Sequence, residues 1–220
     1  RNGVMWKIGF EFEFNKINKE YIRPTEFIEK WVNDKTCYIE AVTYPVDLLP
    51  EGKNRDYLFN LISKDSFILN EGVSGKNCGG HITVSKKGLT GKELFIEFKK
   101  FMPLLYTMYY KRLKYRSCHR NVFLKENEEN KFCTVRVKKY LLEIRLFPMI
   151  KSIDDVFYRY KLIQKISYAI DNNLSYENFL NSVVDLVDKK YRDFSYHFKT
   201  MIEEQKSNKF VRKYLINENK

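Results

Sequence analysis

The sequence has few cysteines and histidines, four of the first and three of the second among 220 residues. No C-x-x-C pair occurs, which argues against a structural zinc cluster. The sequence shows no secretory signal, so we expect reduced thiols and a cytoplasmic protein, in the host cytoplasm or the virion if the source is viral. The four cysteines are Cys37, Cys78, Cys118 and Cys133.

Long apolar runs are absent as well. No stretch approaches the roughly 20 consecutive apolar residues of a membrane-spanning helix, so we expect no membrane partner. The sequence also shows no internal repeat and no linker between domains. We therefore predict a sheet-and-helix core over residues 1–150, with the helices of 151–220 packed on the same domain. With 44% hydrophobic residues, 17 Phe and 16 Tyr, that core is expected to be strongly aromatic.

Acidic residues are the minority among the charged ones. The chain has 28 Asp and Glu against 40 Lys and Arg, which gives a formal net charge of +12. A basic chain favours anionic partners such as nucleotide phosphates, acidic proteins or nucleic acid. The alternative is a set of solvated lysines in a Lys-, Asn- and Ile-rich chain, and the composition leaves both interpretations open.

Residues 8–14 alternate strictly between apolar and polar, which predicts a β-strand. One face carries the acidic pair Glu11 and Glu13, whose side chains lie roughly 6–7 Å apart along a strand. Such a pair repels unless water or a cation lies between its members, although exposed edge strands also carry acidic pairs. Gly9 on the same face leaves room for a ligand. The other face carries Ile8, Phe10, Phe12 and Phe14.

Two later strands each carry one further candidate side chain. Residues 38–42 carry Glu40, and a carboxylate in such a strand needs a partner or solvent. A cation beside Glu11 and Glu13 would be such a partner. His81 follows two glycines at the start of its strand, where it either meets a ligand or is a structural histidine.

Two further strands are expected at 132–137 and 140–147, joined by a turn. In the second of them, Glu143 and Arg145 share one face because they are two residues apart. They either pair with each other or act together on a ligand.

Several helices are also predicted. Residues 25–32 have apolar residues at helical spacing behind Thr25. A capping box at 90–93 opens a long amphipathic helix, which Pro103 should kink or split. From Ser152 onward the pattern is helical, with a last helix over about 191–204 and a basic tail.

Taken in order, these motifs resemble the putative amidoligase family of the glutamine synthetase and glutamate–cysteine ligase superfamily. The resemblance covers roughly residues 7–170. It implies an α+β fold with a curved antiparallel sheet of the glutamine synthetase catalytic-domain type. Helices would pack on one side of the sheet, and ATP and divalent cations would bind its concave face. The motifs are G-F-E-F-E-F at 9–14, E-A-V-T-Y-P at 40–45, C-G-G-H-I-T-V at 78–84, Y-R-S-C at 115–118 and L-E-I-R-L-F at 142–147.

The resemblance also implies a reaction. An ATP- and Mg²⁺-dependent (or Mn²⁺-dependent) ligase would phosphorylate an amino-acid or peptide carboxylate, and an amine would displace phosphate to form an amide or peptide bond. His81 would contact a metal or an ATP phosphate, Arg145 would stabilise the transferred phosphoryl group, and Arg116 would contact phosphate or substrate. Glu13 would belong to the catalytic group with His81 and Arg145. The implied metal ligands are Glu11, Glu13, Glu40, His81 and Glu143.

Two departures from the family pattern keep an alternative open. Thr83 stands where relatives usually have a second histidine, and residues 35–37 match poorly. The alternative is a catalytically inactive amidoligase-fold protein of a virus, phage or mobile element, which binds an anionic partner or nucleic acid.

Overall fold

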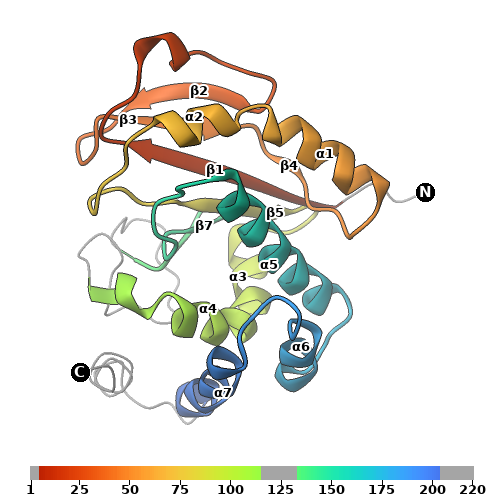
Figure 1. Ribbon diagram of the computed structural model, residues 1–220. Helices are drawn as coiled ribbons and strands as arrows, with labels where there is room; N and C mark the ends of the chain where they lie inside the picture. Colours follow the sequence, from red (N-terminus) through yellow and green to blue (C-terminus); the bar gives the residue numbers. More distant parts are fainter. Residues whose placement is uncertain (1–4, 115–132, 204–220) are drawn as a thin grey trace. The chain divides into compact units, whose positions relative to one another are not determined.

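The computed structural model describes residues 5–114 and 133–203, and Figure 1 shows its ribbon. The chain divides into two compact units. The first comprises 1–87 and 147–164, and the second comprises 88–146 and 165–220. Each unit combines strands with helices, so the predicted α+β class is confirmed. The specific glutamine synthetase type stays a prediction.

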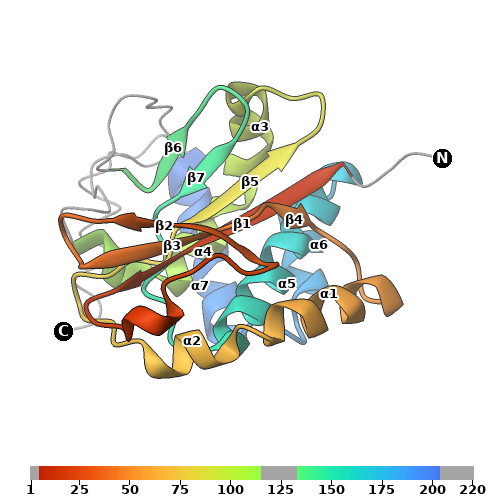
Figure 2. The same ribbon diagram turned by 90° about the horizontal axis from the view of Figure 1, so that it is seen from above.

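The first unit contains a curved, open antiparallel sheet, whose strands Figure 2 shows from above. Its strand order is β2-β3-β1-β5, and β4 pairs with the first residues of β1. The strands are β1 (Trp6–Phe14), β2 (Ile28–Asn33), β3 (Ile39–Thr43), β4 (Val46–Asp47) and β5 (Ile82–Lys86).

The alternation predicted for β1 is confirmed. Ile8, Phe10, Phe12 and Phe14 are all at most 2% exposed. The rings of Phe10 and Phe12 lie 6.4 and 6.2 Å from that of Phe27. Each large apolar side chain buried in this way contributes roughly 1.5–3 kcal/mol of transfer free energy. The apolar face therefore fixes the strand in the core, and the side chains of the acidic face are not needed for core packing.

The helix predicted over 25–32 is wrong, because β2 occupies most of this segment. Trp31 pairs with Ala41 of β3 in an antiparallel register. The Thr25 hydroxyl does accept a hydrogen bond from the N–H of Ile28, at 2.8 Å, but it closes a turn before a strand. A short apolar run fits both the helical and the extended period, and here pairing with β3 decides.

Helices of the first unit include α1 (Lys53–Ser63), α2 (Ser66–Glu71) and the first part of α5 (Ile153–Asp171). Tyr160 of α5 donates a hydrogen bond to the Asp47 carbonyl at 2.5 Å and accepts one from the Leu49 N–H at 2.6 Å. Phe157, one turn earlier, stacks on Phe59 of α1 with 4.2 Å between ring centroids. These contacts tie α5 to the segment that follows β4.

The second unit begins with the predicted capping box. The Thr90 hydroxyl accepts from the Glu93 N–H at 3.2 Å, and the Glu93 carboxylate accepts from the Thr90 N–H at 2.9 Å. The long helix is split as predicted, since Pro103 lies in the first turn of α4. The helical elements here are α3 (Gly91–Phe98), the 3-10 helices Lys99–Phe101 and Tyr110–Lys114, and α4 (Met102–Met108).

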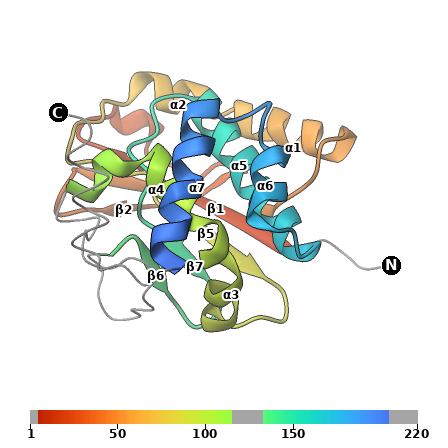
Figure 3. The ribbon, with the colours of Figure 1, turned by 90° about the horizontal axis from the view of Figure 1, so that it is seen from below.

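A hairpin and two further helices complete the second unit. β6 (Val135–Val137) pairs with β7 (Leu142–Ile144) in antiparallel fashion, as predicted but over fewer residues. α7 (Lys189–Glu203) lies beside α4, as Figure 3 shows, with the Tyr106 and Phe198 rings 5.8 Å apart. α6 (Tyr176–Ser182) contributes Phe179, whose ring lies 4.9 Å from Phe101. Among the described helices, none combines the length and apolar character needed to cross a membrane.

Candidate metal centre

Two carboxylates face each other across a pair of strands in the first unit. Glu13 of β1 pairs directly with Glu40 of β3, and Glu11 lies two residues before Glu13 on the same face. One carboxylate oxygen from each of the three residues lies within 4.8 Å of the other two. Like charges directly opposite each other destabilise a strand pair. A divalent cation bound by these hard oxygen ligands would remove that repulsion.

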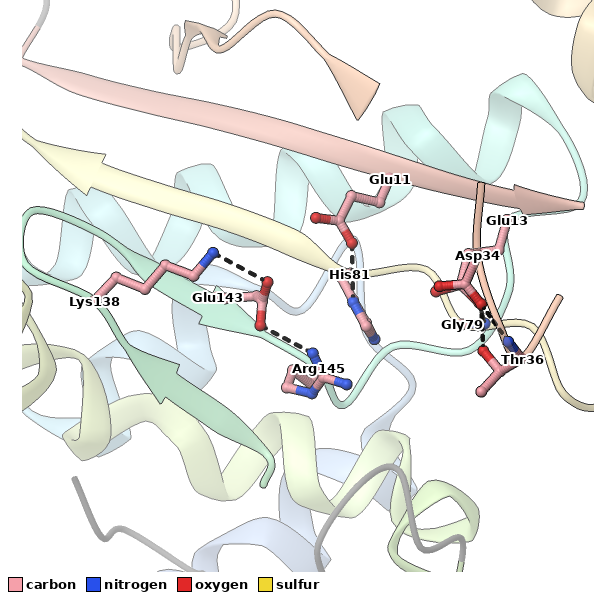
Figure 4. A network of polar contacts seen from close by, with 9 residues as sticks. All are labelled: Glu11, Glu13, Asp34, Thr36, Gly79, His81, Lys138, Glu143 and Arg145. Atoms are coloured by element: carbon pink, nitrogen blue, oxygen red, sulfur yellow. Dashed lines mark hydrogen bonds and ion pairs between the residues drawn. The ribbon is translucent and has the colours of Figure 1, made fainter. Parts of the chain in front are cut away.

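Glu13 is the most deeply buried member of this group, with 6% of its surface exposed. Its Oε2 accepts a hydrogen bond from the Gly79 N–H at 2.6 Å, which Figure 4 shows. Burial raises the pKa of Glu13 above its ordinary value, while His81 and the Gly79 N–H act in the opposite direction. The carboxylate thus lies where a bound cation would stabilise its charged form strongly.

His81 lies against Glu11, one member of this group. Its carbonyl accepts from the Glu11 N–H at 3.0 Å, and its Nδ1 lies 2.9 Å from Glu11 Oε2 (Figure 4). The residue as a whole is 8% exposed. A carboxylate on one ring nitrogen orients the imidazole, so that the other nitrogen would be the one available to a metal or a phosphate.

The glycines before His81 serve backbone packing. Gly79 forms an isolated bridge with Pro148, and the Gly80 N–H donates to the Phe147 carbonyl at 3.2 Å. A Cβ at Gly80 would lie 2.3 Å from the Pro148 carbonyl oxygen. The Gly-Gly pair therefore lets two backbone segments approach closely, and this packing places His81 beside Glu11.

The room expected beside Gly9 is not available to a ligand. Gly9 pairs with Thr83 of β5, and a Cβ at Gly9 would lie 2.6 Å from Thr83 Oγ1. The space left by the missing side chain is thus filled by a neighbouring hydroxyl. This corrects the sequence-based interpretation of Gly9.

In the second unit, Glu143 and Arg145 pair with each other. Arg145 Nη1 lies 2.9 Å from Glu143 Oε2, and Lys138 Nζ lies 3.4 Å from Glu143 Oε1 (Figure 4). Both carboxylate oxygens of Glu143 therefore face a cation. The simple pairing anticipated from the sequence is present, and the proposed roles of Glu143 as a metal ligand and Arg145 as a phosphoryl contact stay predictions. Among the described residues, none accepts a hydrogen bond from the buried Nε of Arg145.

The sequence-based predictions did not include some residues that lie in these groups. They did include one residue that falls outside the described part of the chain. Cys37 and Cys78 lie beside Glu13 in the structure, although the two cysteines are 41 positions apart in the sequence. The only available signal was that Cys78 directly precedes the Gly-Gly-His motif. Lys138 lies in the turn expected between the two strands, where the sequence predicts no site residue. Arg116 lies outside the described residues.

Comparison with protein-family models gives no match for this chain, and neither does comparison with curated proteins. The resemblance to amidoligases therefore rests on the five motifs alone and stays a prediction.

Proposed function

We propose that the protein is an ATP- and Mg²⁺-dependent carboxylate–amine ligase that forms an amide or peptide bond through an acyl phosphate. The observation that carries the proposal is the convergence of Glu11, Glu13 and Glu40, with Glu13 and Glu40 directly opposed. A set of carboxylate oxygens suits a hard cation such as Mg²⁺ or Mn²⁺.

The chemistry explains why such a set is needed. A nucleoside triphosphate and a substrate carboxylate are both anions, and they must come together before phosphoryl transfer. A bound Mg²⁺ supplies charge neutralisation for the phosphates. Glu11, Glu13 and Glu40 would hold the cation, and the His81 ring, oriented by Glu11, would contact a phosphate or the metal.

Arg145 has the second role in the proposed reaction. Its planar guanidinium is suited to bidentate contact with a phosphoryl group. The pairing of Nη1 with Glu143 holds the group in place, and the Nε donor supports an additional anion contact. Glu143 would act as the further metal ligand only by exchanging its contacts to Lys138 and Arg145 for a cation.

The test is ADP release from ATP in the presence of Mg²⁺ and a panel of amino acids and peptides as acid and amine donors. Glu13→Gln should lower the rate by about 10²–10³-fold or more, as loss of one electrostatic group in such sites does. Glu51→Gln makes the same chemical change at an exposed carboxylate and serves as the matched control. Equal rates for the Glu13→Gln variant and the parent would end the proposal.

A second candidate is a non-catalytic protein of the same fold that binds an anionic partner. It is favoured by the net charge of +12 and by the neutralisation of Glu143 by two cationic side chains. Calorimetry separates the two candidates. Absence of heat with MgATP, together with DNA binding that weakens steeply with salt, would select this second candidate.

A further inference from the structure

Glu13 belongs to a second cluster of metal-ligating side chains. A carboxylate oxygen of Glu13 and the Sγ atoms of Cys37 and Cys78 all lie within 4.8 Å of one another. The three residues are 6%, 7% and 2% exposed. They come from the end of β1, the turn before β3 and the loop before β5, so the fold alone brings them together.

The backbone around Cys37 is fixed by a network of short hydrogen bonds. The Asp34 carboxylate accepts from the N–H groups of Thr36 and Cys37 at 2.6 and 2.9 Å, and Figure 4 shows Asp34 with Thr36. The next residue, Tyr38, donates its N–H to the Phe14 carbonyl at 2.9 Å. The turn that carries Cys37 is thereby held against the end of β1, one residue from Glu13.

The loop that carries Cys78 is held in a similar way. The Cys78 N–H donates to the Gly75 carbonyl at 3.0 Å, and the following N–H, that of Gly79, binds Glu13. The Cys78 thiol donates to Asn15 Oδ1 at 3.4 Å, so an amide oxygen adjoins the Cys78 sulfur. The cluster is therefore preorganised from both sides.

We propose that Cys37, Cys78 and Glu13 form a site for a thiophilic divalent cation, Zn²⁺, with the Asn15 amide oxygen or a water as fourth ligand. Sulfur ligands select Zn²⁺ over Mg²⁺, and zinc accepts two thiolates together with oxygen donors. Zn–S bonds of about 2.3 Å place two thiolates of a tetrahedral ion roughly 3.8 Å apart. Ligand atoms already within 4.8 Å of one another need only a small contraction to reach this arrangement.

Zinc binding at this site is accompanied by the release of protons from the two thiols. Each thiol loses its proton as the metal–sulfur bond forms, so uptake of one Zn²⁺ at this site frees two protons to solvent. The site shares Glu13 with the proposed ligase centre, but zinc binding here needs neither a nucleotide nor an amine.

A disulfide between the two cysteines is the competing outcome. It would need an external oxidant, and it would leave the buried carboxylate of Glu13 beside an uncharged bond. A Zn²⁺ ion instead bonds the carboxylate and both thiolates at once and offsets two of their three negative charges, which is why the cluster favours metal binding.

The experiment uses the reduced, metal-stripped full chain, with Co²⁺ as the spectroscopic probe and Zn²⁺ for X-ray absorption. We expect one equivalent of Co²⁺ to produce thiolate-to-metal charge-transfer absorption. We expect the Zn²⁺ spectrum to show two sulfur neighbours at about 2.3 Å with oxygen ligands for the rest. Both measurements use the parent chain, so they do not depend on the folding of a variant.

Variants then locate the site. Cys37→Ser and Cys78→Ser should each weaken Zn²⁺ binding by at least about tenfold. Cys133→Ser, which replaces a buried thiol of the second unit, should leave Zn²⁺ affinity unchanged. Glu51→Gln, at an exposed carboxylate outside the sulfur cluster, should also leave it unchanged. Circular dichroism confirms that each variant is folded.

Three results would overturn the proposal. The first is cobalt or zinc bound without sulfur neighbours in the parent chain. The second is a loss of Zn²⁺ affinity that is equal for Cys133→Ser and Cys37→Ser. The third is a reduced chain that takes up no Zn²⁺ yet forms the Cys37–Cys78 disulfide under mild oxidation.

Discussion

The hydroxyl of Thr83 fills the space that Gly9 leaves open on the acidic face of the sheet. The two residues pair in register across β1 and β5, and a Cβ at Gly9 would lie 2.6 Å from Thr83 Oγ1. Gly9 is thus the steric complement of Thr83. This relationship explains the glycine inside a strand whose other apolar residues are large and buried.

The pair makes a direct prediction. Gly9→Ala should lower the free energy of unfolding by about 1–3 kcal/mol through overpacking. Adding Thr83→Ala should recover part of that loss, so the two changes are coupled by about 0.5–3 kcal/mol. Urea unfolding of the two single variants and the double variant measures the coupling. Strict additivity of the two changes would show that the contact carries no energy.

A second prediction concerns the facing carboxylates. Without divalent cations, Glu40→Gln should raise the free energy of unfolding by about 0.2–1 kcal/mol, because it removes a like charge opposite Glu13. With Mn²⁺ the order should reverse, since the parent chain gains stability from the bound ion and the variant gains less. Thermal melts in chelator and in Mn²⁺ test both halves. If neither Mn²⁺ nor Mg²⁺ changes the melting temperature of the parent chain, the proposed hard-cation site is contradicted.

A third prediction concerns pH. The Asp65 carboxylate accepts from the Thr25 hydroxyl at 2.6 Å, and burial raises its pKa above the ordinary value of 3.8. A raised folded-state pKa gives stability that is fully present below 3.8 and is lost as pH rises through the folded value. Asp65→Asn should therefore stabilise the protein at neutral pH, and the gain should vanish in acid.

Unfolding of this variant and its parent at neutral and acidic pH provides the measurement. The exposed Asp185 supplies the matched control, since Asp185→Asn should change the stability by less than about 0.5 kcal/mol. A neutral-pH loss of stability in Asp65→Asn would mean that the ionised carboxylate is favourable where it lies.

A fourth prediction concerns the link between α5 and the segment after β4. Tyr160→Phe removes the hydroxyl that joins the Asp47 carbonyl and the Leu49 N–H, and it should cost about 1–3 kcal/mol. Burial raises the pKa of Tyr160 to about 12, so this cost should stay constant through the neutral range. Chemical denaturation measures it, with Tyr57→Phe at an exposed position as control. A cost no larger than that of the control would show that the two hydrogen bonds are dispensable.

Local features could be predicted because neighbouring residues set them. The buried Phe residues of β1, the capping box at Thr90 and the helix break at Pro103 each depend on a few adjacent positions. The segment over 25–32 shows the limit of this reasoning. Its apolar residues suit a helix in isolation, but the edge of β3 offers backbone partners that turn the segment into β2.

Local periodicity is enough to place Glu11 and Glu13 on one face of a strand, because side chains alternate along an extended backbone. The folded arrangement of the strands was needed to show that Glu40 lies opposite Glu13 and that His81 contacts Glu11. It also decided that the thiols of Cys37 and Cys78 meet the same carboxylate. Such meetings depend on strand register and on the paths of loops, and both follow from the packing of the whole core rather than from nearby residues.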